Sequence, residues 1–175
     1  MVEKFIMTAF CKDRPGIVAD ITETVYENGC NLEDSTMTSM LDEFAIILLF
    51  SGNKDGLEAQ LLKDCRRLER DKGITALLRP VGAKEKKVQE KTHTKIINVE
   101  GLDQSGIVYK VSRFLADNNI NIENLSSRRL ISPETGTAIY SMELRVQVPG
   151  EISPNKFEEG LSRVGEELNV EIVIS

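Results

Sequence analysis

Apolar positions along the chain follow two different periods, and they do so in the same order twice. In the first half, short apolar segments predict four strands, at 4–10, 31–38, 44–50 and 74–79. Apolar residues at helical spacing predict two helices between those strands, one from Ile17 to Val25 and one at about 55–70. The second half repeats the pattern with strands at 95–99, 121–131, 137–148 and 170–174. Its helices are predicted to begin at Ile107 and to cover about 154–168.

An internal repeat indicates that the two halves are copies of one unit. Asp13-Arg-Pro-Gly-Ile-Val18 recurs as Asp103-Gln-Ser-Gly-Ile-Val108 at a shift of 90 positions, and at this shift Asn28 meets Asn118. Beyond residue 40 the shift becomes 98, which predicts a longer excursion around 132–136 in the second copy. We therefore expect two domains, 1–81 and 95–175, joined by a polar, basic linker over 82–94.

The order β-α-β-β-α-β predicts an α+β fold, with two ferredoxin-like units in tandem. Each unit would place two helices on one face of a four-stranded antiparallel sheet. Asp13 and Asp103 suit the N-cap of the first helix in each unit. Asn28-Gly29 and Asn118-Asn119 suit its end, because these residues tolerate the left-handed conformation.

Composition and charge exclude several classes of function. The 175 residues carry a net charge of −6, with a pI near 5.0, which argues against direct binding to nucleic acid. The longest apolar run, Phe44–Phe50, is too short to span a membrane, and residues 1–7 do not resemble a signal peptide. Three cysteines without a Cys-x-x-Cys pair predict reduced thiols in a cytoplasmic protein.

Histidine chemistry has almost no support. The single histidine, His93, lies in the polar stretch Lys-Thr-His-Thr-Lys and is interpreted as a solvated linker residue. Without a second histidine or an adjacent nucleophile, neither a catalytic triad nor a histidine-based metal site is expected. We therefore expect no metal and no cofactor.

The repeated Asp-x-x-Gly turn inside a β-α-β-β-α-β unit of about 80 residues resembles an ACT domain. Two such units in tandem, the first with Asp-Glu-Phe-x-x-x-Leu-x-x-Ser-Gly at 42–52, are similar to the glycine cleavage system transcriptional repressor group. The resemblance implies a regulatory module that binds a small amino acid, with glycine or serine suggested. It also implies that the ligand lies at the first loop and the start of the following helix.

The resemblance assigns candidate ligand-binding residues in both units. They are Asp13, Arg14, Pro15, Gly16, Ile17 and Asn31 in the first unit, and Asp103, Gln104, Ser105, Gly106, Ile107 and Asn121 in the second. A helix start offers free amides to a carboxylate, and a glycine there lets the backbone approach the ligand. The alternative is that each turn only caps its helix, and which repeat binds stays open.

Two classes of function remain. The first is a non-catalytic sensor that contacts another protein, such as a transcription factor or an enzyme, when the amino acid binds. The second is a small enzyme on a ferredoxin-like scaffold, for example an acylphosphatase-like hydrolase with Arg14 and Asn31 in its site. The lack of a phosphate-binding glycine loop disfavours the enzyme.

A comparison of the repeats predicts an apolar patch on the first unit only. The second unit alternates Met142, Leu144 and Val146 with Glu143 and Arg145, so one sheet face should meet water. In the first unit both sets are apolar. The predicted patch on its helix-free face consists of Ile6, Phe10, Ala45, Ile47 and Leu49. Such a patch marks an interface, either with a partner subunit in a homodimer or with the chain's own linker or second repeat.

Overall fold

The computed structural model describes residues 2–82, 92–132 and 135–175. The chain divides into two compact units, unit 1 up to residue 86 and unit 2 from residue 87. Most of the predicted linker, 83–91, and part of the predicted excursion, 133–134, lie outside the described residues. Each unit is described by itself.

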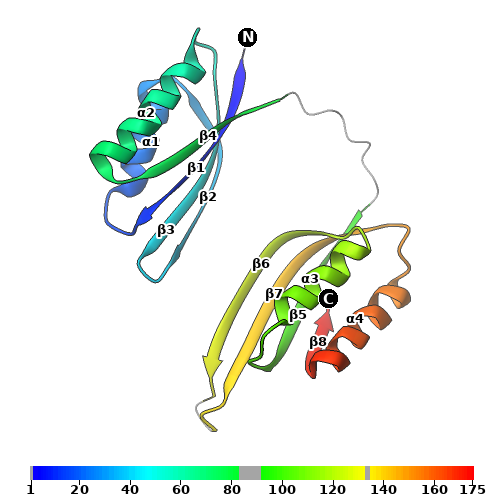
Figure 1. Ribbon diagram of the computed structural model, residues 1–175. Coiled ribbons are helices and arrows are strands. Elements are labelled where there is room, and N and C mark those ends of the chain that lie inside the picture. The colour runs from blue at the N-terminus through cyan, green and yellow to red at the C-terminus, as the bar shows by residue number, and fades with distance from the viewer. Residues whose placement is uncertain (1, 83–91, 133–134) are drawn as a thin grey trace. The chain divides into compact units, whose positions relative to one another are not determined.

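Unit 1 is a four-stranded antiparallel sheet with the strand order β2-β3-β1-β4. Its elements are β1 (Glu3–Lys12), α1 (Ile17–Glu27), β2 (Asn31–Met40), β3 (Glu43–Gly52), α2 (Leu57–Lys72) and β4 (Thr75–Val81). Both helices lie on the same face of the sheet (Figure 1). The central strands β1 and β3 are neighbours, as the ferredoxin-like order predicts.

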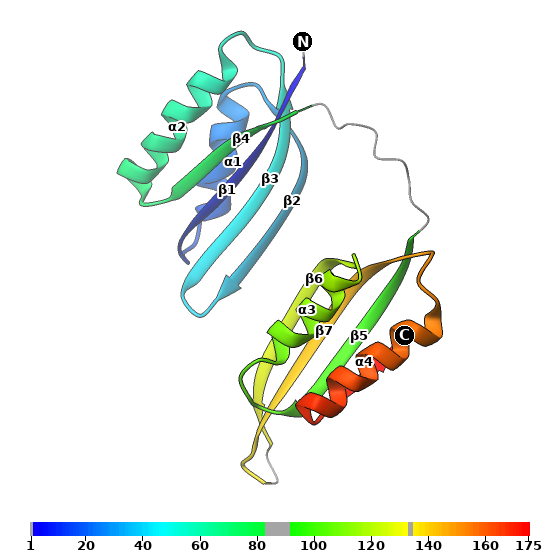
Figure 2. The ribbon, with the colours of Figure 1, turned by 45° about the vertical axis from the view of Figure 1, so that its right-hand side comes forward.

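Unit 2 repeats this architecture with the order β6-β7-β5-β8. Its elements are β5 (Thr92–Leu102), α3 (Ile107–Asp117), β6 (Asn121–Ile131), β7 (Ala138–Pro149), α4 (Pro154–Leu168) and β8 (Val170–Ile174). Again both helices cover one face of the sheet (Figure 2). The predicted α+β fold, with two β-α-β-β-α-β units, is confirmed.

The prediction that Asp13 and Asp103 cap the first helix of each unit is wrong. The cap residues are Gly16, at φ 89°, and Gly106, at φ 98°, and neither helix start has a side-chain cap. These left-handed glycines turn the chain after each aspartate, so the helices begin only at Ile17 and Ile107. The prediction for the helix ends is confirmed, because Gly29 and Asn119 both have positive φ.

β5 begins earlier than the sequence indicates. Thr92, His93 and Thr94, which were assigned to the linker, already pair with Pro149, Val148 and Gln147 of β7. The strand is extended by backbone pairing, which apolar alternation in the sequence does not reveal. Pairing with β3 extends β1 to Lys12 in the same way. His93 is therefore an exposed strand residue and not a linker residue.

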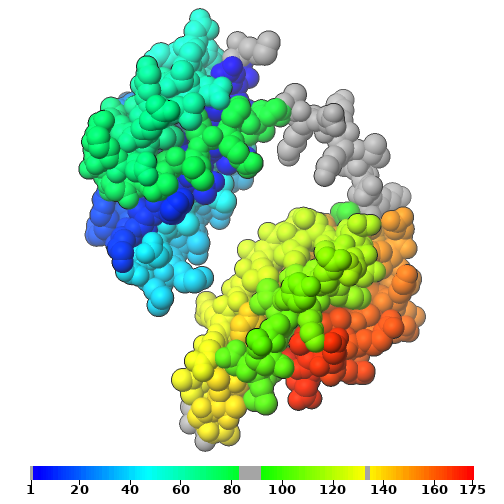
Figure 3. All heavy atoms as spheres, in the orientation of Figure 1, coloured from blue at the N-terminus to red at the C-terminus, as the bar shows by residue number. Residues whose placement is uncertain are grey.

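Each unit has its own apolar core between its sheet and its two helices. In unit 1 the core includes Phe5, Met7, Leu48 and Phe50 from the sheet. In unit 2 it includes Ile97 and Leu144. The edge strand β2 is exposed along its whole length, because the helices sit over the other strands. In the space-filling view α3 and α4 lie side by side over unit 2, and β6 emerges beside α3 (Figure 3).

Candidate functional site

The first loop of unit 1 joins the end of β1 to the start of α1 beside the β2–β3 turn. The Asp13 amide donates a hydrogen bond of 2.8 Å to the Asp42 carbonyl, which anchors the loop. Asp13, Arg14, Pro15 and Gly16 are exposed, whereas Ile17 is buried in the core. Among the described residues no side chain caps the first turn of α1, so its amides face outward without a side-chain acceptor.

Charges of both signs meet at this helix start. Arg14 Nη2 donates to Asp20 Oδ2 at 2.7 Å, and Lys72 Nζ, from the end of α2, donates to Asp20 Oδ1 at 2.9 Å. Two hydrogen bonds lower the pKa of Asp20, and the bond from Lys72 has a larger effect than the bond from Arg14. The Asp20 carboxylate is therefore ionised at neutral pH. We call Arg14, Asp20 and Lys72 the charge cluster.

A groove of about 760 Å³ lies next to the charge cluster. Asp20 and Lys72 form its polar end, and Tyr26, Cys30 and Leu32 line its apolar part. The groove thus runs along α1 toward the start of β2. Sequence analysis found Arg14 but missed Asp20 and Lys72, which lie 52 positions apart and meet only when α1 and α2 pack together.

The first loop of unit 2 is held in place by different hydrogen bonds. The Asp103 amide donates to the Ala138 carbonyl at 3.0 Å, and the Asp103 carboxylate accepts a 2.7 Å hydrogen bond from Arg129 Nε. Gln104 donates to the Leu168 carbonyl at the end of α4. Ser105 and Gly106 are exposed, and Ile107 is buried. An ion pair again joins the two helices, but with the cation on the first helix, as Lys110 of α3 donates to Glu167 of α4.

The structure does not bring Asn31 and Asn121 to the helix starts of their own units. Asn31 pairs with Ser51, and Ser51 with Lys4, at the far end of the sheet from the loop that follows Lys12. Eight strand residues separate the two ends, about 26 Å at 3.3 Å per residue. Asn121 pairs with Gln147 in the same way. Within either unit the structure therefore does not bring the asparagine and the first loop of that unit together.

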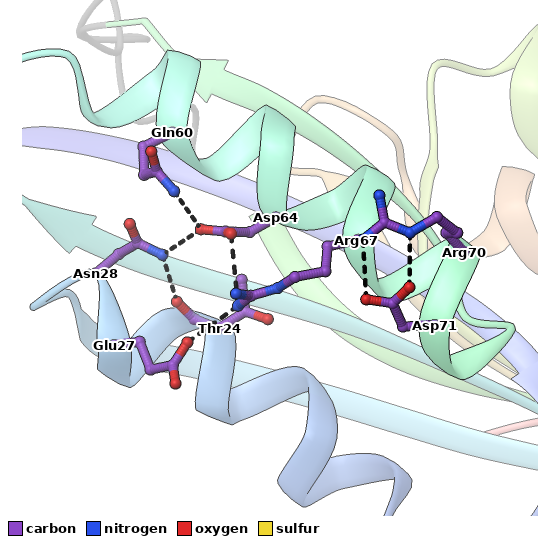
Figure 4. Close-up of polar contacts among 8 residues, drawn as sticks. All are labelled: Thr24, Glu27, Asn28, Gln60, Asp64, Arg67, Arg70 and Asp71. Carbon is purple, nitrogen blue, oxygen red and sulfur yellow. Dashed lines mark hydrogen bonds and ion pairs between the residues drawn. The ribbon is translucent and has the colours of Figure 1, made fainter.

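A buried polar network between α1 and α2 was also missed by sequence analysis (Figure 4). Asn28 Nδ2 donates to the Thr24 carbonyl at 2.8 Å and to Asp64 Oδ2 at 2.9 Å, and Gln60 donates to the same carboxylate oxygen at 3.2 Å. Arg67 Nη2 lies 3.5 Å from Asp64 Oδ1. Asn28 and Asp64 are each only 6% exposed, so their hydrogen bonds tie the helices together.

Burial disfavours the thiolate form of all three cysteines. Cys11, Cys30 and Cys65 are free thiols, and burial raises the pKa of each one. Burial, together with a smaller effect of the Asp64 carboxylate, raises the pKa of Cys65 to about 11. Over residues 2–82, 92–132 and 135–175 no three His, Cys, Asp or Glu side chains are grouped as metal ligands. In the same part of the chain no helix has the length and apolar character needed to cross a membrane.

Comparisons with known proteins agree with this architecture. Models of the ACT domain match residues 3–78 and 95–152. The chain is 26% identical over 178 residues to the glycine cleavage system transcriptional repressor of Escherichia coli strain K12, covering 95% of this chain and 86% of that protein. The crystal structure of an unknown protein from Galdieria sulphuraria matches with a TM-score of 0.82 and 30% identity, covering 100% and 98% of the two chains.

A second solved structure shares the fold across both units. It is provisionally assigned as a glycine cleavage system transcriptional repressor and matches with a TM-score of 0.71 and 20% identity, covering 100% of this chain and 97% of that one. The resemblance that the repeated Asp-x-x-Gly turn indicates is thus confirmed in both halves of the chain.

Proposed function

Because this chain belongs to the ACT-domain family, we propose that it is a cytoplasmic, non-catalytic sensor that binds a small amino acid in unit 1. At the coarser level it is an ACT-domain regulatory protein related to the glycine cleavage system repressor. In our proposal the bound amino acid changes the contact of this protein with another protein, either a transcriptional regulator or an enzyme.

The charge cluster is the observation that carries the proposal. A free amino acid is a zwitterion, so its site needs a cation for the carboxylate and an anion for the ammonium group. Arg14 and Lys72 supply cations, and Asp20 supplies the anion between them. A zwitterion can exchange with these ion pairs without leaving a charge unpaired, and the adjacent groove of about 760 Å³ has room for a small side chain.

The start of α1 supplies a second element of the site. Gly16 has no Cβ, and the nearest heavy atom to an added Cβ would be Arg14 Nη1 at 4.0 Å, so the backbone is open to an approaching ligand. The uncapped amides of the first turn attract a carboxylate through their partial positive charge. Arg14 would then hold the same carboxylate from its side chain.

Unit 1 is favoured over unit 2 because the second loop is differently charged. Gln104 replaces Arg14 and is bound to the Leu168 carbonyl, while Asp103 is bound to Arg129. The position of the Asp20 carboxylate is occupied by Lys110. Unit 2 thus lacks, at its first loop, the arrangement of two cations around one carboxylate that unit 1 has.

The enzyme alternative loses its main support in the geometry. It pairs Arg14 with Asn31, and the register of β1, β2 and β3 places these residues at opposite ends of the sheet. The family match favours a regulatory role for both units. We therefore keep the sensor and not the hydrolase as the proposed function.

A panel of the twenty amino acids tests the proposal by thermal shift. Glycine and serine come first, because the relative from Escherichia coli is named for the glycine cleavage system. A ligand that binds only the native state stabilises it by about 2.7 kcal/mol at a hundredfold excess over its dissociation constant. If no amino acid raises the melting temperature, the sensing function is wrong.

Two matched glycine variants locate the site. Gly16→Val and Gly106→Val place the same side chain at equivalent caps, with φ values of 89° and 98°, so both suffer similar backbone strain. We expect calorimetric titration to show loss of amino-acid binding in Gly16→Val and retention in Gly106→Val. Retained binding in Gly16→Val would exclude the helix start of unit 1.

A further inference from the structure

One face of the unit 1 sheet carries no helix, and strand pairing fixes which residues lie on it. Three rows cross the middle of this face in the strand order β2, β3, β1, β4. They are Thr38-Ala45-Phe10-Thr75, Thr36-Ile47-Thr8-Leu77 and Asp34-Leu49-Ile6-Arg79. We call these twelve residues the open face of unit 1. All five residues of the predicted apolar patch belong to it.

The open face has an apolar centre that is accessible to solvent. Phe10 and Ile47 are 46% and 47% exposed, and Leu77 is 61% exposed. The first two rows contain no charged residue. The third row has charged residues only at its two ends, Asp34 on the edge strand β2 and Arg79 on the edge strand β4. A contiguous apolar surface of this kind marks an interaction site.

The equivalent face of unit 2 is charged at its centre. Its middle rows are Arg128-Ser141-Glu100-Glu171 and Ser126-Glu143-Asn98-Val173, followed by Asn124-Arg145-Ile96. Glu100, Glu143 and Arg145 are exposed on the two central strands. The two units therefore have the same fold but different helix-free faces. The charged face of unit 2 is compatible with exposure to solvent, whereas the apolar face of unit 1 is expected to be buried in an interface.

We propose that two copies of this chain pair through the open face of unit 1, sheet against sheet. Sheets pack face to face about 10 Å apart with their strands nearly aligned. A twofold axis along the strands, between the two sheets, would place β2 of each copy over β4 of the other, and β3 over β1. Each row of the open face then lies across from the same row of the second copy.

In the first two rows of this arrangement large side chains oppose small ones, and in the third row Leu49 meets Ile6. Phe10 meets Ala45 in the first row, and Ile47 meets Thr8 in the second. Leu77 meets Thr36 at the edges of the second row. Alternation of large and small residues across two facing layers is what allows them to interdigitate. The open face is thus complementary in shape to a second copy of itself.

The charges of the third row are complementary as well. Asp34 lies on β2 and Arg79 on β4, in line with Leu49 and Ile6. The twofold axis brings Asp34 of each copy across from Arg79 of the other, so the dimer gains two opposite-charge pairs at its rim. In a twofold-symmetric interface the same surface meets itself, so its acidic and basic residues must lie at opposite edges. Asp34 and Arg79 meet this requirement.

Other parts of this chain fit the open face poorly. The helix-free face of unit 2 would bring Glu100, Glu143 and Arg145 against apolar residues without partners for all of them. The segment between β4 and β5, 82–91, contains four lysines and two glutamates. Both would bury charge against Phe10 and Ile47, which a second copy does not.

Ile47→Lys tests the proposal, with Val173→Lys as its control. Val173 lies on the helix-free face of unit 2 and is 50% exposed, so both variants add a lysine to a sheet surface of similar exposure. In sedimentation equilibrium we expect twice the 19.6 kDa chain mass for the wild type and Val173→Lys. For Ile47→Lys we expect the dissociation constant of the dimer to rise roughly a hundredfold, because each copy would bury a lysine charge against Thr8 of the other copy without a partner.

Three outcomes would overturn the proposal. A monomeric wild type whose melting loses cooperativity in Ile47→Lys would assign the open face to a segment of the same chain. A monomeric wild type without that change would leave the open face unpaired. A dimer unaffected by Ile47→Lys would place the subunit contact elsewhere on the molecule.

A charge exchange provides an independent test that leaves the apolar centre intact. Asp34→Arg and Arg79→Asp each place like charges opposite one another, and we expect each to weaken the dimer about tenfold. The double variant restores opposite pairs and should recover the wild-type dissociation constant. Single variants that leave that constant unchanged, or a double variant that is weaker than both, would contradict the twofold arrangement.

Discussion

Equivalent residues join the two helices of each unit by different chemistry. In unit 1, the Asn28 amide donates to the Thr24 carbonyl and to the Asp64 carboxylate, which also accepts from Gln60. In unit 2, the positions of Thr24 and Gln60 are taken by Phe114 and Gly160, and Phe114 stacks on Phe157 with ring centroids 6.4 Å apart. Asn118 keeps only the backbone bond, to the Phe114 carbonyl. A polar contact thus holds one helix pair and an aromatic contact the other.

This difference predicts unequal effects of one substitution. Asn28→Ala leaves the Asp64 carboxylate without one of its buried donors, whereas Asn118→Ala breaks only a bond to a backbone carbonyl. We expect Asn28→Ala to lower the free energy of unfolding by about 1–3 kcal/mol and Asn118→Ala by about 1 kcal/mol. Urea unfolding of both variants measures the difference. Equal losses would mean that the network contributes nothing beyond a helix cap.

Asp20 predicts a pH dependence of stability. Hydrogen bonds from Lys72 and then Arg14 lower its pKa in the folded state, below the ordinary value of 3.8. Its contribution is therefore present above that value and is lost as the pH falls through the lower, folded pKa. We expect Asp20→Asn to be less stable than the wild type at pH 7, and the gap to close in strong acid. Asp55→Asn, an exposed carboxylate on the same unit, is the control and should show a smaller gap throughout.

Sequence reasoning located some site residues and misplaced others for identifiable reasons. The repeated Asp-x-x-Gly turn found Arg14 and Gly16, because a left-handed glycine before a helix leaves a local pattern. Asn31 is predicted with them because a side-chain oxygen at the entry of the second strand suits the ammonium group of an amino acid, although strand register puts it at the far end of the sheet from the loop of its own unit. Asp20 and Lys72 leave no local pattern, since their contact depends on how two helices pack.

Element types followed from apolar periodicity, while element lengths followed from hydrogen bonding. The alternation of Met142, Leu144 and Val146 with charged residues predicted the strand β7 and its buried face, and these three side chains are buried. β2 has few apolar residues and is exposed throughout, yet it extends to Met40 because it pairs with β3 along its length. Thr92–Thr94 joined β5 for the same reason.

Packing between α3 and α4 predicts the effect of a single methyl group. A Cβ on Gly160 would lie 2.5 Å from the Phe114 ring, which is already stacked on Phe157. Alanine within a helix gains about 0.5–1 kcal/mol over glycine, but overpacking costs about 1–3 kcal/mol. We expect Gly160→Ala to lower the free energy of unfolding of unit 2 by about 1 kcal/mol.

A smaller side chain at position 114 provides the control for that prediction. In a Phe114→Leu background the ring that meets the new Cβ is removed, so Gly160→Ala should stabilise the helix or leave it unchanged. A double-mutant cycle in urea measures the coupling between the two positions. Additive effects would show that the Phe114 ring does not limit the space at Gly160.

The whole molecule combines two complete folds that differ in their surfaces. Each unit has a separate apolar core, and on the surface the two units differ at their first loops and on their helix-free sheet faces. Unit 1 carries the charge cluster and the open face, and unit 2 carries a charged sheet face instead. In our proposals unit 1 therefore contains both the amino-acid site and the subunit contact.

Separate cores predict that a core defect stays within its own unit. Leu61 of α2 and Leu161 of α4 are both fully buried, each in the core of its unit. Truncation of either to alanine should cost about 2–5 kcal/mol. In hydrogen exchange we expect Leu61→Ala to lower amide protection in unit 1 only, and Leu161→Ala in unit 2 only.

The same pair of variants separates the roles of the two units in assembly. If unit 1 provides the subunit contact, Leu61→Ala should also raise the dissociation constant of the dimer, because partial unfolding of unit 1 competes with pairing. Leu161→Ala should leave that constant unchanged, since its defect lies in a unit outside the contact. Sedimentation equilibrium, run on the samples used for hydrogen exchange, measures both. Loss of protection in both units from either variant would show that the two cores unfold as one cooperative structure.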